Sequence, residues 1–592
     1  MFTDTYDPQT NGAVDSIKKF TKELRKRGHK VYIFCPYDKK LKKNKYIIPL
    51  RSVKFLPYPE YRIGLPSARI IKHIKKIRPD VIHIQSPATI GLAGLAIAKY
   101  YNIPTVATYH TLLTEYFSYI STSHEKMSKK SIIKFTKWFF SKVDKIIVPS
   151  TSIIKILKRY GIHKPMEVIM TGIYLKKRML KKKHKNEIPL ILHVGRICKE
   201  KRIDVIIKAF KKILKQRDAK LVITSDGPDR ERLEKLVDTL KIADKVLFTG
   251  YISDTKRDQY YKDADVFVTA SKTETQGIVL AEALSIGCPV VVKNSLGFKD
   301  VIKNGYNGFL FNNEKGMIKS IFKVLDDASL RKKFVKNAKE TVNELSVEKT
   351  SDKLIDSYNN LLYSEKISVI IPTYREEKYI KKTLESVRKQ TYPNYEIIVV
   401  DGNSPDATRK IARKYADKVI NLRERGVAKA RNVGTKVATG DIFVFLDGDT
   451  IIEKNFIKKI VNLFRNKNIS GVFPQGRTRG KKSQVIFDLQ NIGVAISTFF
   501  RFPMLPGTCV IYRRSFFEKT KGFIEGYVTA EDIIFSLKNR KYGKLIYSNK
   551  VSFETSNRRV RGNRSTGTIV FWIKNIPKSL FGTPSEKYEP VR

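Results

Sequence analysis

The sequence predicts an α/β protein made of three Rossmann-like units that follow one another along the chain. Short apolar runs alternate with amphipathic helical stretches over most of the 592 residues, as in parallel sheets covered by helices. A chain of this length is too long for one hydrophobic core, and its 42% hydrophobic content is that of a globular protein. Apart from this alternation we find no internal sequence repeat.

The first unit is predicted over residues 1–172. Its buried parallel strands are expected in the apolar runs KVYIFCP (30–36), DVIHIQS (80–86), TVATYHT (105–111) and KIIVPS (145–150). Crossover helices are expected over 13–29 and 68–80, where Gly28 and Pro79 are suitable stops. The first strand of such a unit is almost absent, because Met1 lies only three residues before Asp4.

The same alternation restarts over residues 173–345 and again over 367–560. Strands of the second unit are expected in PLILHVGR (189–196), KLVITSDG (220–227), KVLFTGY (245–251), ADVFVTAS (264–271) and CPVVVKN (288–294). Strands of the third unit are expected in ISVIIPTYRE (367–376), EIIVVDG (396–402) and DIFVFLDGD (441–449). Residues 346–366 are predicted to form a helix and a charged linker, and residues 561–592 a basic, then apolar tail.

The chain is strongly basic, with 115 Lys and Arg against 57 Asp and Glu and a formal net charge of +58. Three interpretations are open: a solvated surface without a specific partner, attraction to an anionic membrane face, and nucleic-acid binding. The basic residues are dispersed and no nucleic-acid-recognition motif accompanies them, which disfavours the third interpretation.

The cysteines and the opening residues favour a cytosolic protein. Four scattered cysteines without metal-site spacing are typical of a reducing compartment. Acidic residues stand where a secretory signal would need an apolar run, and no uncharged apolar stretch of about 20 residues is found.

The run TETQGIVLAEAL (273–284) places Gly277 between a predicted strand and a predicted helix. Free amides at a helix N-terminus bind phosphate, and a glycine there lets phosphate approach the backbone closely. Glu282 would lie on the helix and suit ribose hydroxyls, whereas Glu274 would precede it and suit the hydroxyls of a sugar. Two glutamates eight residues apart are, on their own, more often solvated charges.

Further polar groups follow other predicted strands of the first two units. Arg196 and Lys201 come after the strand at 189–196 and could neutralise a diphosphate. Gly12 lies in the first strand-to-helix loop, and His110 lies at the end of the strand at 105–111. A lone histidine is more often structural, but ligands of open parallel sheets bind at the carboxyl ends of strands.

Together these motifs make residues 1–363 resemble the family 4 glycosyltransferases of the GT-B fold. The resemblance rests on FTDTYDPQTNGAVDSI, RGHKVYIF, TYHT, GRICKEKR, SDGP and the two glutamates. It implies retaining, metal-independent transfer from a nucleoside-diphosphate sugar that is held between an acceptor-side and a donor-binding Rossmann domain. The site residues that it implies are the catalytic His110 and Glu274 and the donor-binding Gly12, Arg196, Lys201, Gly277, Ile278 and Glu282.

Carboxylates mark strand ends in the third unit. Asp447 and Asp449 follow the strand DIFVFL, where two carboxylates one residue apart suit a hard divalent cation with positions open for phosphate oxygens. Asp401 ends the strand EIIVVD and is suited to hydrogen-bond a base or ribose. Glu531 and Asp532 stand ahead of a later helix, and both a proton-accepting role and a favourable interaction with the helix dipole are open for them.

This series resembles the family 2 glycosyltransferases of the GT-A fold, over about residues 367–560. The resemblance implies inversion by direct displacement, with Mn²⁺ or Mg²⁺ bound by Asp447 and Asp449. It implies Asp532 or, less favoured, Glu531 as the general base. Many processive members carry a Gln-x-x-Arg-Trp motif, but SNRRVRGNR (556–564) occupies that region here, so single additions are expected.

Two basic and apolar segments are candidates for contact with a membrane. SKKSIIKFTKWFFSKV (128–143) could lie on an anionic surface or pack Trp138 and Phe139 into a core. The tail 561–592 could lie on a bilayer or cover the last sheet. The opening residues and the run 80–120 are most similar to members that glucosylate diacylglycerol or mannosylate phosphatidylinositol.

The sequence therefore predicts a bifunctional glycosyltransferase with one metal-independent half and one half that uses Mn²⁺ or Mg²⁺. Its expected partners are UDP- or GDP-linked sugars, a glycolipid or lipid-linked glycan acceptor and an anionic membrane surface, without nucleic acid. We expect a cytoplasmic protein that is peripheral on the inner face of the cell membrane. The alternatives are a single glycosyltransferase whose other half is a binding module, and a basic nucleic-acid-binding protein.

Overall fold

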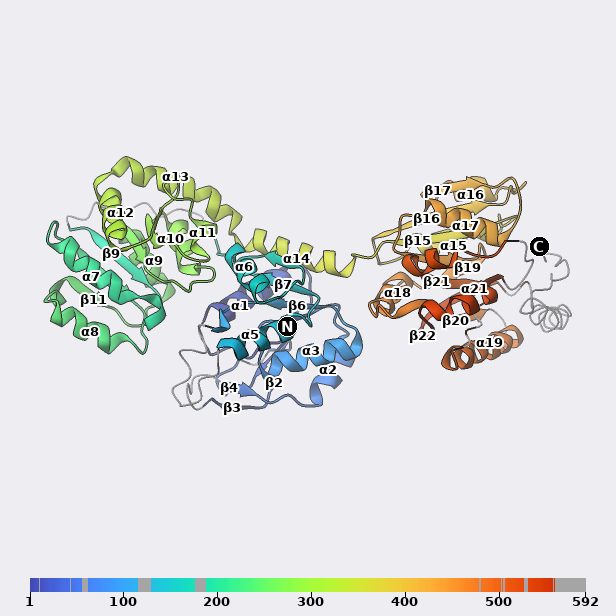
Figure 1. The fold of residues 1–592 in the computed structure, drawn as a ribbon, viewed down its shortest axis with the longest axis horizontal. Coiled ribbons are helices and arrows are strands. Elements are labelled where there is room, and N and C mark those ends of the chain that lie inside the picture. Colours follow the sequence, from blue (N-terminus) through green and yellow to red (C-terminus); the bar gives the residue numbers. More distant parts are fainter. Residues whose placement is uncertain are drawn as a thin grey trace. The chain divides into compact units, whose positions relative to one another are not determined.

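The computed structural model divides into two compact units, Met1–Leu362 and Tyr363–Arg592 (Figure 1). It describes residues 1–9, 11–42, 44–55, 62–114, 129–175, 188–478, 481–501, 503, 506–525, 531–556 and 558. The division of the chain falls inside the predicted linker 346–366.

The N-terminal half of the first unit contains parallel strands surrounded by helices (Figure 1). Its strands are β1 (Ile33–Pro36), β2 (Ile47–Leu50), β3 (Ser52–Lys54), β4 (Arg62–Gly64), β5 (Ile82–Ile84), β6 (Thr105–Thr108), β7 (Lys145–Val148) and β8 (Met166–Val168). Its helices are α1 (Gly12–Lys26), α2 (Arg69–Ile77), α3 (Thr89–Tyr101), α5 (Lys129–Phe140) and α6 (Thr151–Arg159). Phe2 bridges Phe34 of β1 and Ile84 of β5, so it lies between these two strands.

Helix α1 shows how local sequence sets these elements. The Asn11 side chain accepts a hydrogen bond from the Val14 amide at 3.0 Å and caps the first turn. Its apolar residues at helical spacing, among them Ile17 and Leu24, are buried. The helix ends before Gly28, whose φ of 85° is the left-handed conformation that terminates many helices.

The C-terminal half of the first unit is a six-stranded parallel sheet in the order β11-β10-β9-β12-β13-β14. Its strands are β9 (Leu190–Val194), β10 (Lys220–Thr224), β11 (Val246–Phe248), β12 (Val266–Thr269), β13 (Val290–Lys293) and β14 (Phe309–Phe311). Its helices are η1 (Lys199–Lys201), α7 (Ile203–Leu214), α8 (Arg230–Thr239), η2 (Ala243–Lys245), α9 (Asp254–Asp263), α10 (Ile278–Ile286), α11 (Phe298–Val301), α12 (Glu314–Asp326), α13 (Ala328–Glu344) and α14 (Val347–Leu362). The strand order reverses between β9 and β12, where such sheets bind ligands.

Helix α14 returns from the second half to pack on the first. Arg27, which follows α1, donates to the Glu348 carbonyl at 2.9 Å and forms an ion pair with Asp352. Tyr358 places its hydroxyl 2.6 Å from Nδ1 of His83 in β5. These contacts tie the two halves of the first unit together.

The second unit is an eight-stranded mixed sheet in the order β17-β16-β15-β18-β21-β20-β22-β19. Its strands are β15 (Ile367–Thr373), β16 (Tyr395–Asp401), β17 (Lys418–Asn421), β18 (Ile442–Leu446), β19 (Thr450–Ile452), β20 (Ile469–Thr478), β21 (Cys509–Arg513) and β22 (Lys544–Thr555). Its helices are α15 (Ile380–Arg388), α16 (Thr408–Ala412), α17 (Val427–Val437), α18 (Phe456–Phe464), α19 (Lys481–Phe499), α20 (Arg514–Phe517), η3 (Glu518–Thr520), α21 (Glu531–Asn539) and η4 (Arg540–Tyr542). The four strands from β17 to β18 are parallel, and β21 pairs with β18 in antiparallel fashion.

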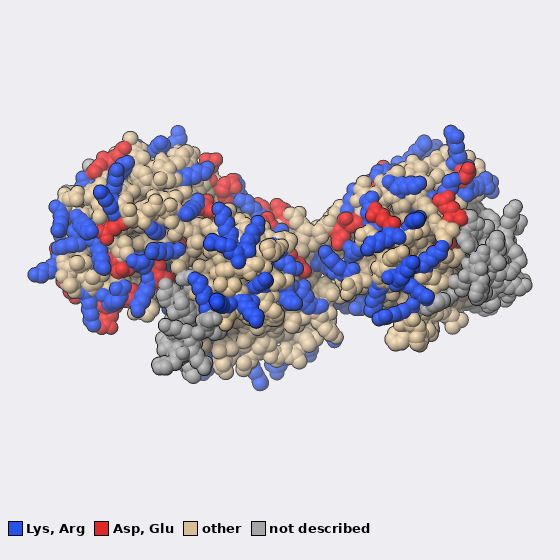
Figure 2. All heavy atoms as spheres, viewed as in Figure 1, with Lys and Arg blue, Asp and Glu red and all other residues tan. Residues whose placement is uncertain are grey.

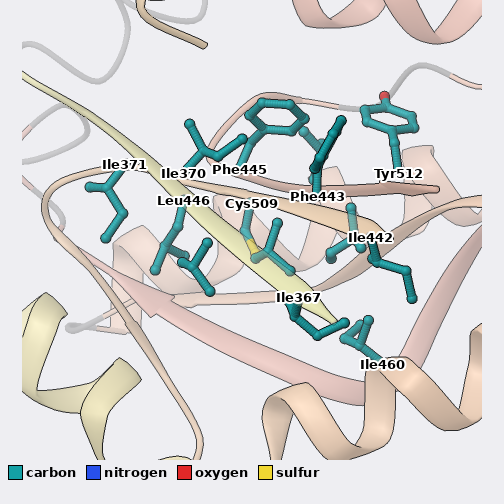
Figure 3. Packing of buried hydrophobic residues seen from close by; sticks show 14 of the residues in the cluster. Ile367, Ile370, Ile371, Ile442, Phe443, Phe445, Leu446, Ile460, Cys509 and Tyr512 are labelled. Atoms are coloured by element: carbon teal, nitrogen blue, oxygen red, sulfur yellow. The ribbon is translucent and has the colours of Figure 1, made fainter. Parts of the chain in front are cut away.

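The core of the second unit forms around β15 and β18 (Figure 3). Ile367, Ile370 and Ile371 of β15 and Phe443 and Phe445 of β18 are buried. Because side chains on both faces of these strands are covered, their sequences read as continuous apolar runs. That is why they were recognisable in the sequence.

Positive charge is spread over both units, as Figure 2 shows for one face. All four cysteines are buried. Of the helices that the structure describes, none is both long and apolar enough to cross a membrane.

Candidate active sites

An ion pair joins the two charged motifs of the first unit. Lys201, from the turn after β9, places Nζ 2.5 Å from Oε2 of Glu274, which follows β12. These are the two strands between which the strand order reverses, so their loops border the expected ligand crevice. Burial acts to raise the pKa of Glu274, but the Lys201 ammonium outweighs it, and the pKa lies below its usual value. Glu274 is therefore an anion at neutral pH.

Two glycines allow close approach at the start of α10. Gly277 caps the helix with φ 81°, a left-handed conformation, and a Cβ there would lie 2.7 Å from Cε1 of Phe298. A Cβ on Gly12 would lie 3.7 Å from Cδ1 of Ile278. The structure thus brings Gly12, from the first half of the unit, against Ile278, the residue after Gly277 in the second half.

Glu282 lies on α10 and contacts α9. Nη2 of Arg257 lies 3.3 Å from its Oε1, and the Tyr261 hydroxyl donates to its Oε2 at 3.4 Å. Burial raises the pKa of Glu282, although the positive charges of Arg257 and of Lys19 on α1 partly offset this effect. Both contacts are long, so the carboxylate keeps lone pairs that ribose hydroxyls could use.

His110 lies two residues beyond β6 and faces the other half of the unit. Thr275 donates its hydroxyl to the His110 carbonyl at 3.0 Å, and Nε2 of His110 donates to Oε1 of Gln85 at 2.7 Å. Burial lowers the pKa of His110 to about 4, so its ring is neutral at physiological pH. His110 lines a small cavity together with Gln276.

Arg196 and His193 complete the polar groups at the end of β9. The Arg196 side chain is exposed at the start of the turn that carries Lys201. The sequence pattern did not single out His193, which is buried in β9 and donates from Nδ1 to the Val268 carbonyl at 2.9 Å. Within the described part of the chain its Nε2 has no hydrogen-bond partner. The available signal was a histidine inside an otherwise apolar strand.

The acidic motif of the second unit lies at the corresponding point of its sheet. The strand order reverses between β15 and β18, and Asp447–Asp449 forms the turn from β18 into β19. Asp447 Oδ1 lies 3.4 Å from Nη2 of Arg431. Asp449 Oδ2 lies 3.0 Å from Nη2 of Arg558 and accepts a hydrogen bond from Ser556. The two aspartates therefore have different cationic neighbours.

Arg431 is a buried arginine that the sequence analysis did not identify. It lies on α17, its side chain is only 2% exposed, and Nη2 donates to the Gly507 carbonyl at 2.7 Å. Its Nη1 lies 3.0 Å from Oε1 of Glu531. The signal that could have revealed it is its setting between Ala428, Ala430 and Gly434, small residues that mark the buried face of a helix.

Asp532 lies beside Glu531 at the start of α21, next to Arg431. Burial and then the Glu531 carboxylate raise the pKa of Asp532 to about 7, against the opposing charge of Arg431. A Cβ on Gly507 would lie 2.6 Å from Oδ2 of Asp532 and 2.7 Å from Nη2 of Arg431. The glycine thus lets a guanidinium and a carboxylate of near-neutral pKa approach the same point of the backbone.

Asp401 is placed differently from the other predicted site residues. It is fully buried, and its carboxylate accepts hydrogen bonds from the Ser404 amide at 2.8 Å, the Ser404 hydroxyl at 2.6 Å and the Thr373 hydroxyl at 3.2 Å. Arg409 lies 3.5 Å away. Direct contact with a base or ribose would require some of these bonds to open.

The chemistry of Asp447 and Asp449 suits a hard divalent cation. Mg²⁺ in particular commonly binds one or two carboxylates and takes its remaining ligands from water and substrate phosphates. In the described parts of the chain no group of three or more His, Cys, Asp or Glu is arranged to hold a metal ion. The two aspartates fit such a cation only if phosphate oxygens of a bound donor complete its coordination.

The structure describes one of the two segments that were candidates for membrane contact. In α5, Phe139 and Phe140 are buried, whereas Trp138 is 49% exposed beside exposed lysines. The helix thus packs Phe139 into the core, as one alternative proposed, but not Trp138. The tail 561–592 lies outside the described residues.

Family models match three consecutive segments of the chain. Residues 10–177 match Glycosyltransferase Family 4, residues 176–341 match Glycosyl transferases group 1, and residues 368–521 match Glycosyl transferase family 2.

Characterised relatives cover the first unit. The alpha-monoglucosyldiacylglycerol synthase of Streptococcus pneumoniae is 33% identical over 345 residues, which are 55% of this chain and 77% of the relative. The enzyme of the same name from Acholeplasma laidlawii is 29% identical over 365 residues, 57% of this chain and 90% of the relative. The structure of sucrose-phosphate synthase from Thermosynechococcus elongatus covers 60% of this chain and 94% of its own, with a TM-score of 0.51 at 20% identity, which shows a shared fold.

These matches agree with the architecture of each unit. The two halves of the first unit are Rossmann-like, as in the GT-B fold. The second unit, which contains the family 2 match, has a mixed sheet. The chain is therefore a glycosyltransferase that belongs to the group 1 and family 4 glycosyltransferases in its first unit and carries a family 2 glycosyltransferase domain in its second.

Proposed function

We propose that the chain is a bifunctional enzyme that transfers sugars from two nucleoside-diphosphate sugars to a glycolipid or lipid-linked glycan. The observation that carries this proposal is that each unit has its own charged site where its strand order reverses. Lys201 and Glu274 form the first site, and Arg431 with the acidic pairs forms the second. Both sites keep all the charged residues of their motifs. This favours two active halves over one active half joined to a binding module.

In the first unit the donor would bind between the two halves without a metal. Lys201 and the exposed Arg196 would neutralise the nucleoside diphosphate as the bond from the sugar C1 to its oxygen breaks. Backbone amides at the start of α10 would bind phosphate, because Gly277 has no side chain to exclude it. We assign Glu274 and His110 to the reacting sugar and Glu282 to the ribose, with retention at C1.

In the second unit Asp532 would act as the base. The acceptor hydroxyl gives its proton to the Asp532 carboxylate, its oxygen bonds to the sugar C1, and the nucleoside diphosphate leaves with the electrons of the broken C1–O bond. A pKa of about 7 makes this carboxylate both partly ionised and sufficiently basic near neutral pH. Mn²⁺ or Mg²⁺ held by Asp447 and Asp449 would neutralise charge on the leaving diphosphate.

Arg431 would position the groups of this second site. Its two nitrogens hold Glu531 and Asp447, so the acidic pair at the start of α21 keeps a fixed place relative to the turn after β18. Asp401 would act indirectly, since its bonds to Ser404 and Thr373 fix the loops after β15 and β16.

The acceptor class follows from the relatives. Two of them are named for synthesis of a glucosylated diacylglycerol, and a lipid acceptor requires an enzyme that works at a membrane surface. We therefore propose peripheral association of this basic chain with the anionic inner face of the cell membrane. UDP- and GDP-linked sugars are both suitable donors, because the residues assigned above would contact phosphate, ribose and sugar rather than a particular base.

The two reactions would be consecutive steps on one glycan. Fusion would raise the local concentration of the first product near the second site. The test uses Glu274→Ala and Asp449→Ala, each of which leaves one half intact, with a set of sugar nucleotides and lipid acceptors. We expect the product that Asp449→Ala releases to be an acceptor for Glu274→Ala. If neither variant's product is used by the other, consecutive action is wrong, and if one half never consumes a donor, that half is a binding module.

A further inference from the structure

Helix α19 packs on β20 through both polar and apolar side chains, yet leaves a row of apolar side chains exposed. Asn491, which is 5% exposed, donates to the Gly476 carbonyl and accepts from the Gly476 amide, both at 2.9 Å. Gln484 accepts from the Thr478 amide at 2.9 Å. These polar side chains bind the helix to β20, and Val494 of the same helix is buried in the core. Helices at the surface of a globular protein normally turn their other apolar residues inward too.

The outward side of α19 and the residue after it form an apolar face. Its members and their exposed fractions are Val485 (58%), Leu489 (65%), Ile492 (55%), Ile496 (54%), Phe499 (81%) and Phe500 (73%). The spacing of four and three residues puts them on one side of the helix. Figure 2 shows an area without charged residues where Figure 1 places α19. Large exposed apolar faces mark interaction sites.

The apolar face is connected to the second active site. The chain leaves α19 after Phe499 and reaches Gly507, against which Asp532 and Arg431 lie. On the way, the Pro503 carbonyl accepts a hydrogen bond from Ser536 of α21 at 2.8 Å, and α21 is the helix that begins with the acidic pair. A surface that binds the end of α19 is therefore close along the chain to Gly507, against which the proposed base lies.

The charged residues near the apolar face indicate which kind of surface it binds. Arg501 directly follows the two phenylalanines, and Arg477 lies next to Gly476, to which the helix is bound; both side chains are exposed. The whole chain carries a formal net charge of +58. An apolar helix face with an arginine directly after it suits the interface of an anionic bilayer, where apolar side chains enter the acyl region and cations contact the headgroups.

We propose that the exposed face of α19 docks the second unit on an anionic phospholipid bilayer and so presents a lipid-borne hydroxyl to Asp532. The assignment rests on the proposed function for the nature of the acceptor, but the docking itself is independent of catalysis. Phe499 and Phe500 would enter the bilayer, and Arg501 would lie at the headgroups.

The first test is binding of the full chain to vesicles of phosphatidylcholine with phosphatidylglycerol, at a salt concentration that screens simple charge attraction. Leu489→Glu with Ile496→Glu should weaken binding by about tenfold or more, since two large apolar side chains no longer favour the lipid. The matched control is Leu247→Glu with Tyr251→Glu, which changes two exposed apolar residues of the first unit and should leave binding unchanged. Equal binding by wild type and the α19 variant would overturn the proposal.

The second test measures insertion directly. Because the four native cysteines are buried, Ile492→Cys can be labelled with an environment-sensitive fluorophore. Its emission should shift to the blue when the vesicles are added, whereas the same label on Tyr251→Cys should not shift. An unshifted label at 492 would contradict docking, even if the two-glutamate variant had lost stability.

A second copy of this chain is the competing occupant of the face, because the spacing also suits helix pairing. Sedimentation of wild type and of Leu489→Glu with Ile496→Glu separates the two. If the wild type is a dimer, the variant is a monomer and vesicle binding is the same for both, the face serves self-association instead. These tests measure binding and insertion rather than catalysis. An inactive chain that docks would refute the proposed function alone. An active chain that does not dock would refute only this inference.

Discussion

In the second unit the guanidinium of Arg431 lies between two acidic motifs that are far apart in the sequence, 3.4 Å from Asp447 and 3.0 Å from Glu531. It is buried, and Asp532 lies next to it. One cation therefore serves both the expected metal-binding turn and the expected base. Removing it would leave buried carboxylates uncompensated, which is costly.

Arg431→Met should lower transfer by the second unit about a hundredfold or more, and destabilise that unit by about 3–5 kcal/mol. The pH profile separates positioning from mere stability: without the arginine, the pKa of Asp532 rises further, and the activity that remains should move to higher pH. Arg431→Lys should recover part of the activity. Lys436→Met, an exposed change on the same helix, should have no effect; an unshifted pH profile in Arg431→Met would count against the assigned role.

Asp532→Asn should reduce transfer by the second unit by about 10²–10⁴-fold while donor binding persists. In the wild type the base must be ionised, so activity should fall as pH drops below about 7. The raised pKa also means that folding is favoured by the protonated form, and this stability is lost as pH rises through about 7. Asp532→Asn should therefore unfold at a higher temperature than the wild type at alkaline pH, as measured by calorimetry, and a lower temperature there would contradict the assigned pKa.

Lys201→Met should inactivate the first unit by about 10²–10³-fold, because the diphosphate loses a cation and Glu274 loses its partner. Transfer by the second unit should be unchanged. Lys199→Met removes an exposed lysine from the same turn and is the matched control. Equal rates for the two variants, measured as donor consumption, would show that the ion pair does not serve catalysis.

Gly277→Ala should destabilise the first unit by about 2–4 kcal/mol, the sum of a left-handed alanine and an overpacked contact with Phe298. Gly305→Ala shares the positive φ but meets nothing within 4 Å, so it should cost only about 1 kcal/mol. Denaturant unfolding followed by a probe in the first unit compares the two. A similar loss of stability in both variants would mean that backbone strain alone, without crowding by Phe298, accounts for the effect at position 277.

The sequence was most informative where strands are buried on both faces. β15 and β18 appear as ISVIIPT and IFVFL because helices or loops cover both sides of the sheet. β20 and β22 escaped recognition, since ISGVFPQGRT contains glycines and a proline, and KLIYSNKVSFET mixes polar with apolar residues. Their pairing with each other depends on long-range contacts that no local pattern encodes.

Charged site residues were recognisable when they belonged to a motif with other charged residues. Asp447 and Asp449 form such a motif, whereas Arg431 is a single charge on a helix, a pattern that more often indicates a solvated side chain. Arg558 was noted only as part of the segment that replaces a processive motif, yet it bonds both oxygens of Glu376, 182 residues away in the sequence. The apolar face of α19 was missed because the helix carries apolar residues on both its buried and its exposed side, and the sequence alone does not tell the two apart.

The most direct test of two independent active sites is donor consumption by Glu274→Ala and Asp449→Ala, each with and without a chelator of divalent metals. Glu274→Ala should retain only activity that the chelator abolishes and that Mn²⁺ or Mg²⁺ restores. Asp449→Ala should retain only activity that the chelator leaves unchanged. Loss of all donor consumption in either single variant would contradict the account, because it would mean that the chain has one active site rather than two.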